Sequence, residues 1–445
     1  MAPASKARRR EALSLRAGAF AAALGGLSAL ASCQLVGDFD EPRSTPEGPA
    51  LRLAARASYA CAWVVGGEAQ CWGRRPSGAG ARASAHVPAS VREREGDALT
   101  GVAELALGDE HSCARLTDGR VKCWGSNAFG QLGVPPSGAN DHSPVPLFVE
   151  DQTGAWLTGV VTIALGSNHS CALLADGHGR VVCWGSNARG QAGAAVEKGG
   201  QTYAPVVVEA TGHADLTDVA QLSLGDEHSC ARLTDGHVKC WGSNASGQLG
   251  PQIEGDDDAS PSVVEGLEGV EEISVGGNKS CARLAGGRVK CWGEGYGPYP
   301  TPVGDRYDGD DGGLLSDAVE LDSGGSSHDC VRDLEKVVKC WQRRPPPVSD
   351  AAPADGASAP ALRLALLERD RFDDAPEPVK DQNGAPLRDV AELALGDDHS
   401  CARLTDGHVK CWGSNASGQL GNPTRAGDPE PISYPLPVEG LTLVR

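Results

Sequence analysis

The sequence predicts an all-β fold of seven repeated units, each built from short antiparallel strands. The first observation is a cysteine pair with nine residues between its members and a tryptophan directly after it. This pattern occurs six times, and a seventh copy is two residues longer. The second observation is the period, because most first cysteines lie 49–59 residues apart, a spacing typical of propellers and solenoids. The third is composition: 59 glycines, 29 prolines and few aromatic residues suit many short strands and turns.

Each cysteine pair lies in a predicted β-hairpin. The stretch 108–133 (GDEHSCARLTDGRVKCWGSNAFGQLG) returns almost unchanged at 225–250 and 396–421, and more loosely at 166–193. A Thr-Asp-Gly loop at 117–119 fits a type I turn that ends in a left-handed glycine. This register places Cys113 opposite Cys123, within disulfide range. The sequence therefore predicts one cross-strand disulfide per unit: Cys61–Cys71, Cys113–Cys123, Cys171–Cys183, Cys230–Cys240, Cys281–Cys291, Cys330–Cys340 and Cys401–Cys411.

Each unit is expected to contain four strands. In the second unit, residues 102–107 form the first strand, the hairpin supplies two more, and residues 144–149 form the fourth. Four-stranded units arranged radially make propeller blades. A strand of the same kind occurs at the C-terminus, at 435–441, and none precedes Leu51. We therefore expect this C-terminal strand to complete the first blade and close the ring, whereas a solenoid would need caps.

The repeated motifs resemble those of the regulator-of-chromosome-condensation repeat. They are Gly-x-x-His-Ser-Cys-Ala-x-Leu, Asp-Gly-x-Val-x-Cys-Trp-Gly and Ser-Asn-Ala-x-Gly-Gln-Leu-Gly, in this order, and the resemblance covers residues 51–445. It implies a seven-bladed β-propeller. Three repeats depart from the pattern: repeat one has Tyr59 at the histidine position, repeat five has Lys279 there, and repeat six has Leu334-Glu335-Lys336 in place of its turn.

The first 33 residues resemble a bacterial lipoprotein signal. A basic front is followed by a small, mostly apolar run at 17–32, which is short for a membrane span, and then by Cys33. We expect Cys33 to be lipidated, with an ordinary signal peptide as the alternative. Residues 34–50 then form a flexible tether, and 51–445 form the propeller, with a disordered insert at about 342–388. Gln34 after the cysteine points by the same resemblance to the outer membrane, on its periplasmic or cell-surface side, and export allows the disulfides to persist.

Charge and motifs argue against several classes of function. The net charge of −19 argues against binding to nucleic acid, which requires a surplus of Lys and Arg. No metal site or cofactor is expected, because the cysteine spacing does not match zinc motifs and the acidic run at 308–312 has glycine at its third ligand position. We interpret the histidines that precede the cysteines as structural groups bonding their local turns, and the tryptophans as blade packing. These histidines are His111, His169, His228, His328 and His399.

Function is expected to reside in the segments that differ between repeats. They follow the Gly-Gln-Leu-Gly position and lie, by strand direction, on the same face as the turns between strands one and two. We expect a non-enzymatic, surface-anchored monomer that binds a protein or a glycan through this loop-rich face and contacts the membrane only through its lipid. The alternatives are guanine-nucleotide exchange, by analogy with the namesake of the family, and secreted enzyme inhibition. Export argues against nucleotide exchange on a cytosolic GTPase.

Overall fold

The computed structural model describes residues 51–74, 84–94, 96–135, 141–193, 200–210, 212–304, 314–325, 328–342, 375–425 and 430–443. The predicted signal, Cys33 and the tether lie outside these residues, as does the run 308–312. Of the predicted insert, residues 343–374 lie outside the description. Residues 375–388 lie within it and contain a short strand, so this part of the insert is ordered.

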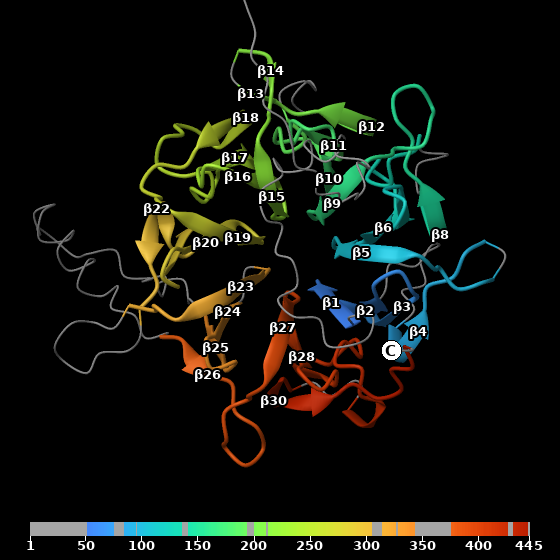
Figure 1. Cartoon of the computed structure of the whole chain (residues 1–445), viewed down its shortest axis with the longest axis vertical. Helices are drawn as coiled ribbons and strands as arrows, with labels where there is room; N and C mark the ends of the chain where they lie inside the picture. The colour runs from blue at the N-terminus through green and yellow to red at the C-terminus, as the bar shows by residue number, and fades with distance from the viewer. Residues whose placement is uncertain are drawn as a thin grey trace, which may run out of the picture. The chain divides into compact units, whose positions relative to one another are not determined.

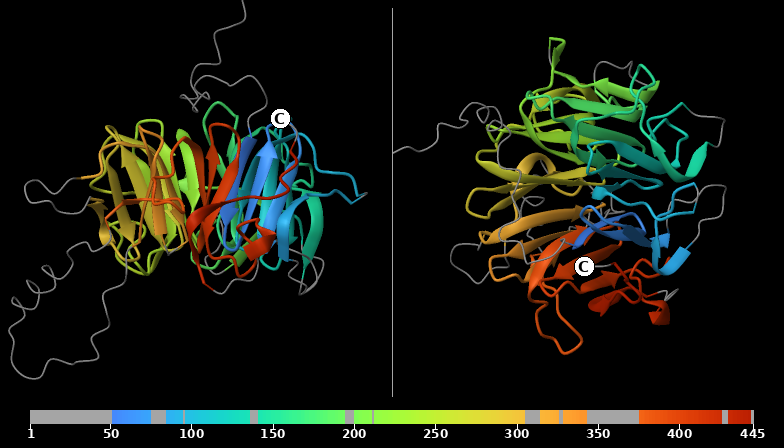
Figure 2. Two further views of the ribbon diagram at one scale, coloured as in Figure 1. Left: turned by 90° about the horizontal axis from the view of Figure 1, so that it is seen from below. Right: turned by 45° about the vertical axis from the view of Figure 1, so that its right-hand side comes forward.

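Seven four-stranded antiparallel sheets stand radially around one axis (Figure 1). This arrangement confirms the predicted seven-bladed propeller. In Figure 2 the strands run between two faces of the ring. We number the blades 1 to 7 along the chain.

Each blade is a simple meander in which the first strand is innermost and the fourth outermost. The innermost strands are β1 (Leu51–Arg56), β5 (Val102–Leu107), β9 (Val160–Leu165), β15 (Val219–Leu224), β19 (Val270–Gly276), β23 (Ala318–Gly324) and β27 (Val390–Leu395). The second strands are β2 (Tyr59–Val64), β6 (His111–Leu116), β10 (His169–Leu174), β16 (His228–Leu233), β20 (Lys279–Leu284), β24 (His328–Asp333) and β28 (His399–Leu404).

The third strands are β3 (Ala69–Arg74), β7 (Val121–Ser126), β11 (Val181–Asn187), β17 (Val238–Ser243), β21 (Val289–Gly293), β25 (Val338–Trp341) and β29 (Val409–Gly413). The outermost strands are β4 (Ser84–Ser90), β8 (His142–Phe148), β12 (Gly200–Val207), β18 (Asp257–Val263), β22 (Gly297–Pro302), β26 (Glu377–Pro378) and β30 (Ile432–Pro437). A two-stranded excursion, β13 (Glu209–Ala210) and β14 (Ala214–Asp215), and one 3-10 turn, η1 (Pro423–Arg425), complete the described elements. Blade 6 therefore has four strands, although β26 has only two residues.

The hairpin register is the predicted one. Cys113 pairs with Cys123, and Gly119 takes a left-handed conformation with φ of 78° at the end of the turn. All seven disulfides form, with Cα–Cα distances of 4.0–4.1 Å. These distances lie near the close, non-hydrogen-bonded kind of cross-strand pair. Apart from the half-buried Cys340, the disulfide cysteines are buried between blades, where they join the apolar clusters that hold neighbouring sheets together.

The pairing of the third and outermost strands is irregular at the tryptophan in six of the seven blades. In blade 4, Cys240 faces Ser262 and Gly242 faces Asp258, so the extra residues of the bulge lie on the outermost strand. Gly242 has a φ of 108°, and a Cβ added to it would lie 2.6 Å from the carbonyl oxygen of Glu227. The glycine is therefore needed for the close approach of the second and third strands.

The predicted closure by the C-terminal strand is wrong. We expected residues 435–441 to complete blade 1, but β30 pairs with β29 in blade 7, where Cys411 faces Leu436. Blade 1 has its own outermost strand, β4, paired with β3. Each hairpin is therefore followed by its own fourth strand, and among the described strands none passes from blade 7 into the sheet of blade 1.

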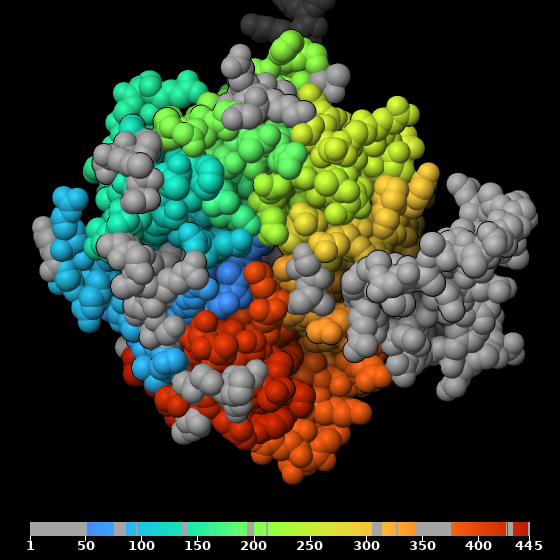
Figure 3. All heavy atoms as spheres, turned by 180° about the vertical axis from the view of Figure 1, so that it is seen from behind, coloured from blue at the N-terminus to red at the C-terminus, as the bar shows by residue number. Residues whose placement is uncertain are grey.

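The ring closes by packing between complete blades. Blade 1 lies directly against blade 7, blue beside red in Figures 1 and 3. The amide of Gln70 donates to the Thr442 hydroxyl at 2.7 Å, and Thr442 N donates to the Gln70 side-chain oxygen at 3.1 Å. Leu53, Ala60 and Trp72 of blade 1 share an apolar cluster with Val409 and Leu420 of blade 7.

Candidate functional site

The repeated histidines hold neighbouring blades together. The ring Nε2 of His111, His169 and His228 lies 2.9 Å from the serine hydroxyl of the next blade, and that of His328 lies at 2.7 Å. The serine partners are Ser170, Ser229, Ser280 and Ser400. The hydrogen bond therefore leaves the blade, whereas the sequence had indicated a bond within the local turn.

For Ser170, Ser229 and Ser280, the direction of the bond follows from a second hydrogen bond that the serine hydroxyl donates. Ser229 Oγ donates to the carbonyl of Gln191 at 3.0 Å, so it accepts from His169 Nε2. Burial lowers the pKa of His111, His228 and His399 to about 3 and that of His328 to about 4, and it lowers the pKa of His169 well below its usual value. The five imidazoles are neutral at physiological pH, and the bonded ones serve as donors between blades.

Blade 5 replaces this contact with a buried ion pair. Lys279 Nζ lies 3.0 Å from Asp329 Oδ1 of blade 6 and also donates to the carbonyl of His328 at 3.0 Å. The two charged side chains are 4% and 2% exposed. Asp329 occupies the serine position of its repeat, so lysine and aspartate replace histidine and serine together. The sequence analysis noted Lys279 but missed Asp329, which the repeat alignment could have revealed.

Blade 1 makes a third version of this contact. The Tyr59 hydroxyl lies 3.1 Å from Ser112 Oγ and 2.8 and 2.9 Å from the carbonyl oxygens of Gly108 and His111. Burial raises the pKa of Tyr59, so the phenol stays protonated. Ala60 occupies the serine position of blade 1, so His399 of blade 7 has an alanine in place of the serine side chain that the other histidines meet.

The tryptophans also bond across blade boundaries. Their indole Nε1 donates to the carbonyl of the glutamine in the preceding blade's Gly-Gln-Leu-Gly segment, at 2.8–3.0 Å. The donors are Trp72, Trp184, Trp241 and Trp292. Blade 5 has no such segment in its sequence. Trp341 of blade 6 therefore donates to the hydroxyl of Tyr296 in blade 5, at 2.8 Å. The repeated residues thus build the ring.

A second set of ties, which the sequence analysis missed, lies on the innermost strands. Four glutamates pair with the arginine of the adjacent strand at 2.6–2.9 Å: Glu104–Arg115, Glu272–Arg283, Glu320–Arg332 and Glu392–Arg403. Each carboxylate also accepts a hydrogen bond from the next blade; Glu320, for example, accepts from Leu393 N at 3.0 Å. The recurrence of Val-Ala-Glu-Leu and Cys-Ala-Arg-Leu was the available signal.

One mouth of the ring is covered by Arg56, whose side chain is 8% exposed. Its guanidinium donates to Asp109 at 3.1 Å and to Asp226 at 2.8 Å, so it joins blade 1 to blades 2 and 4. A third aspartate, Asp397, interacts with the same arginine. Burial, together with the neighbouring carboxylates, raises the pKa of Asp397 to about 6 despite Arg56. Three carboxylates surround one cation, so this mouth is acidic.

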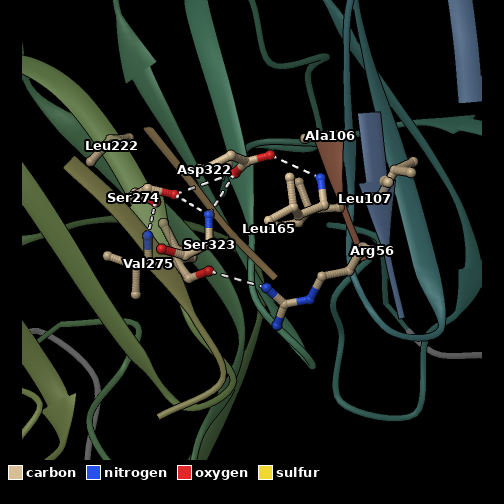
Figure 4. Close-up of a pocket in the computed structure, with 14 residues that line it drawn as sticks. Arg56, Ala106, Leu107, Leu165, Leu222, Ser274, Val275, Asp322 and Ser323 are labelled. Carbon is tan, nitrogen blue, oxygen red and sulfur yellow. Dashed lines mark hydrogen bonds between the residues drawn. The ribbon is translucent and has the colours of Figure 1, made fainter. Parts of the chain in front are cut away.

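Arg56 and the innermost strands line a partly open cavity of about 180 Å³ (Figure 4). Its polar side chains belong to blades 4, 5 and 6: Ser223, Ser274, Asp322 and Ser323. Blades 7, 1, 2 and 3 contribute only aliphatic side chains apart from Arg56: Leu395, Ala55, Ala106, Leu107, Ala164 and Leu165. Apart from Arg56, the polar side chains therefore lie on one side of the cavity, where Leu222, Leu224 and Val275 lie among them, and the other side is aliphatic.

The loop-rich face is the one that strand direction predicted. In blade 2, Ser126 N donates to the carbonyl of Glu110 at 2.8 Å, so the long segment after the third strand begins beside the turn between strands one and two. The repeated start of this segment folds on itself: Asn127 Oδ1 accepts from Leu132 N at 3.0 Å, and Asn244 and Asn415 make the same bond. The segments diverge after this common turn.

The described residues offer no free metal site. The single group with suitable geometry is Cys281, Cys291 and Asp329, but the cysteines form a disulfide and Asp329 pairs with Lys279. Among the described residues, we also find no helix with the length and apolar character required to cross a bilayer.

Comparison with known proteins supports the resemblance inferred from the motifs. Two family models, both described as the regulator of chromosome condensation (RCC1) repeat, match this chain. One matches residues 102–131, 160–191, 219–248 and 390–419, and the other matches 118–173 and 235–283. These matches lie in blades 2, 3, 4 and 7 and extend into the second strand of blade 5.

Several curated proteins are similar in sequence. Protein pim1 of Schizosaccharomyces pombe is 29% identical over 227 residues, which cover 47% of this chain and 40% of that protein. Human E3 ubiquitin-protein ligase HERC2 is 30% identical over 194 residues, 43% of this chain and 4% of that protein. The Arabidopsis thaliana ultraviolet-B receptor UVR8 is 26% identical over 338 residues, 75% of this chain and 70% of the receptor. The chain thus spans less than half the length of pim1 and a small part of HERC2.

Solved structures share the fold. Yeast RCC1 (Prp20), solved bound to Kap60, has a TM-score of 0.58 at 18% identity, covering 88% of this chain and 85% of that one. Human WBSCR16 has a TM-score of 0.56 at 21% identity, covering 82% and 89%. These solved structures show that the fold is a β-propeller, and the family models show that several of its blades are similar to the RCC1 repeat.

Proposed function

We propose that this protein is a non-enzymatic recognition propeller that binds a protein partner through its loop-rich face. The observation that carries the proposal is the use of the repeated residues. The histidines, serines, tryptophans, glutamates and disulfides are engaged in holding blades together. What differs between blades is the segment after the third strand, and loops on a rigid scaffold commonly carry binding.

The relatives favour a protein as the partner. The yeast structure is of RCC1 (Prp20) bound to Kap60, and another reports the binding of Prp20p to Gsp1p and histones. A guanine-nucleotide exchange role by analogy is disfavoured because seven disulfides suit an oxidising compartment. Inhibition of a secreted enzyme would use the same face and is a special case of protein recognition.

The proposal also places the protein outside the cytosol, attached through a lipid on Cys33 to the outer membrane. The disulfides support an oxidising environment. Replacement Cys33→Ser should abolish incorporation of radiolabelled palmitate and release the chain from membranes into the soluble fraction. Equal labelling of the variant would refute lipidation at this residue.

Loop replacement tests recognition directly. Residues 251–256 of blade 4 and 194–199 of blade 3 would be replaced by short Gly-Ser linkers, and partners would be captured from envelope extracts under oxidising conditions. The matched control shortens the exposed turn 152–155, on the opposite face of blade 2. We expect both variants to melt like the parent, while only the loop-rich-face variant loses its partner. Unchanged capture of the partner by the loop-rich-face variant would contradict the proposal.

A further inference from the structure

We propose that the central cavity binds a small organic ammonium ion, with the charged group at Asp322 and the alkyl part against the aliphatic wall. The inference concerns the interior of the ring and is independent of the partner proposed for the loop-rich face. It depends on three features of the cavity: one carboxylate without a cation, one unsatisfied hydroxyl and a wall divided into polar and apolar halves.

Asp322 is the single carboxylate among the residues that line the cavity. Its oxygens accept from Leu395 N at 2.9 Å, Ser323 N at 3.0 Å and Ser274 Oγ at 3.3 Å, which are all neutral donors. Burial is the main cause that raises the pKa of Asp322 to about 7. The carboxylate therefore has hydrogen bonds from neutral donors but forms no ion pair with a described residue, and a buried charge of this kind favours a cationic partner.

The Ser323 hydroxyl gives a second, independent indication. Ser323 is 6% exposed and lines the cavity, yet its Oγ has no hydrogen-bond partner among the described residues. A buried hydroxyl without a partner carries a desolvation cost that a ligand can relieve. An ammonium group has three N–H donors, enough for the Asp322 carboxylate and Ser323 Oγ together.

Arg56 does not take the place of this ligand. Its guanidinium lines the cavity, but its hydrogen bonds go to Asp109, Asp226 and the carbonyl of Leu224. With Asp397 nearby, the charge around Arg56 is net negative, so this end of the cavity does not repel a second cation.

The opposite wall determines the class of cation. In Figure 4, Asp322, Ser274 and Ser323 lie on one side, and Ala106, Leu107 and Leu165 lie on the other. A metal ion would need oxygen ligands on both sides, whereas an alkylammonium can place its chain on the aliphatic side. A volume of about 180 Å³ equals roughly six water molecules at about 30 Å³ each, which leaves room for a few carbons.

The probe is propylammonium chloride, titrated into the oxidised full-length chain at pH 8 and followed by calorimetry and methyl NMR. We expect saturable binding that shifts leucine and alanine methyl signals, with 1-propanol binding at least about tenfold more weakly because it lacks the charge. Sodium chloride at equal ionic strength controls for screening.

Two variants locate the site. Asp322→Asn should weaken propylammonium binding by about tenfold or more, and Ser323→Ala by a few fold, since each removes one acceptor. The matched control Asp235→Asn makes the same charge change at an exposed turn and should leave binding unchanged. Retention of binding by folded Asp322→Asn, or a cavity that holds water only and shows no saturable response, would overturn the proposal.

Discussion

Lys279 and Asp329 show how single residues adapt one blade boundary without changing the fold. The pair replaces the histidine–serine hydrogen bond with a charged contact at 3.0 Å in a fully buried site. A buried ion pair is stable only while both partners are present, because removal of either leaves an uncompensated charge. The two positions therefore have to change together.

We expect Lys279→His alone, or Asp329→Ser alone, to lower the free energy of unfolding by about 3–5 kcal/mol. The double variant Lys279→His/Asp329→Ser restores the histidine–serine pair and should recover most of the loss. The measurement is urea denaturation under oxidising conditions. As a control, His228→Lys should lower the free energy of unfolding, and the double variant His228→Lys/Ser280→Asp should recover most of the loss. If the double variants are no better than the singles, the two positions are not coupled.

At the scale of single residues, the sequence predicted which residues recur but not which residues they contact. The register of the hairpin fixed Cys113 opposite Cys123, because the two lie a few residues from one short turn. The bond from His169 to Ser229 joins residues 60 positions apart and depends on how two separate sheets pack. Local rules do not specify that packing, and the partner of His169 therefore emerged only from the structure.

At the scale of strands, the third strand of a blade depends more on the disulfide where its pairing with the fourth strand is short. In blade 2, β7 pairs with β8 at four positions, whereas in blade 6 β25 pairs with the two-residue β26. The third strand of blade 6 thus depends more on the Cys330–Cys340 bridge. The sequence located the weak blade by its altered turn, but not the shortness of its outer strand.

Removing a disulfide that closes a loop of this size should cost about 2–3 kcal/mol in the chain-entropy model. We expect Cys330→Ala/Cys340→Ala to speed amide hydrogen exchange throughout β25, because its outer neighbour β26 pairs with it at only two positions. The matched variant Cys113→Ala/Cys123→Ala should leave exchange in β7 slower than in β25. Equal acceleration in both blades would contradict the argument.

The whole molecule should respond to acid through its buried histidines. An imidazole whose pKa falls from about 6.5 to about 3 on folding contributes stability that is present above pH 6.5 and is lost as the pH decreases. Six described carboxyls act in the opposite direction, because burial raises the pKa of each of them: Glu104, Asp226, Glu272, Asp322, Glu392 and Asp397. Burial raises the pKa of Glu272 and Asp322 to about 7 and of Asp397 to about 6, so their contribution is present at low pH and is lost as the pH rises toward those values.

The five imidazoles outnumber the three carboxyls with the largest shifts, Glu272, Asp322 and Asp397, so unfolding should take up protons between about pH 6.5 and 4.5. We therefore expect the melting temperature to decrease steadily over this range, measured by circular dichroism with the disulfides intact. His228→Gln should reduce the slope, because one fewer imidazole is protonated on unfolding. A melting temperature that increases on acidification would show that the carboxyls dominate.

The architecture of the whole ring was largely predictable, because a period near 50 residues with a repeated hairpin leaves few alternatives. Its closure was not, since strand chemistry alone does not tell whether β30 pairs with its own hairpin or with the first blade. The cavity could not be foreseen for a related reason. Ser274 and Asp322 occupy ordinary strand positions, and only the radial arrangement of the blades brings them together.

The closure by complete blades has a topological consequence. Because every blade has an even number of antiparallel strands, the chain enters and leaves each blade on the same face, and Gln70 and Thr442 tie the two ends of the ring there. The peptide link between any two blades is thus interchangeable with the non-covalent junction between blades 7 and 1. A circular permutant opened within 210–214, with its original ends joined by a linker, should rebuild the same ring with the same seven cystines.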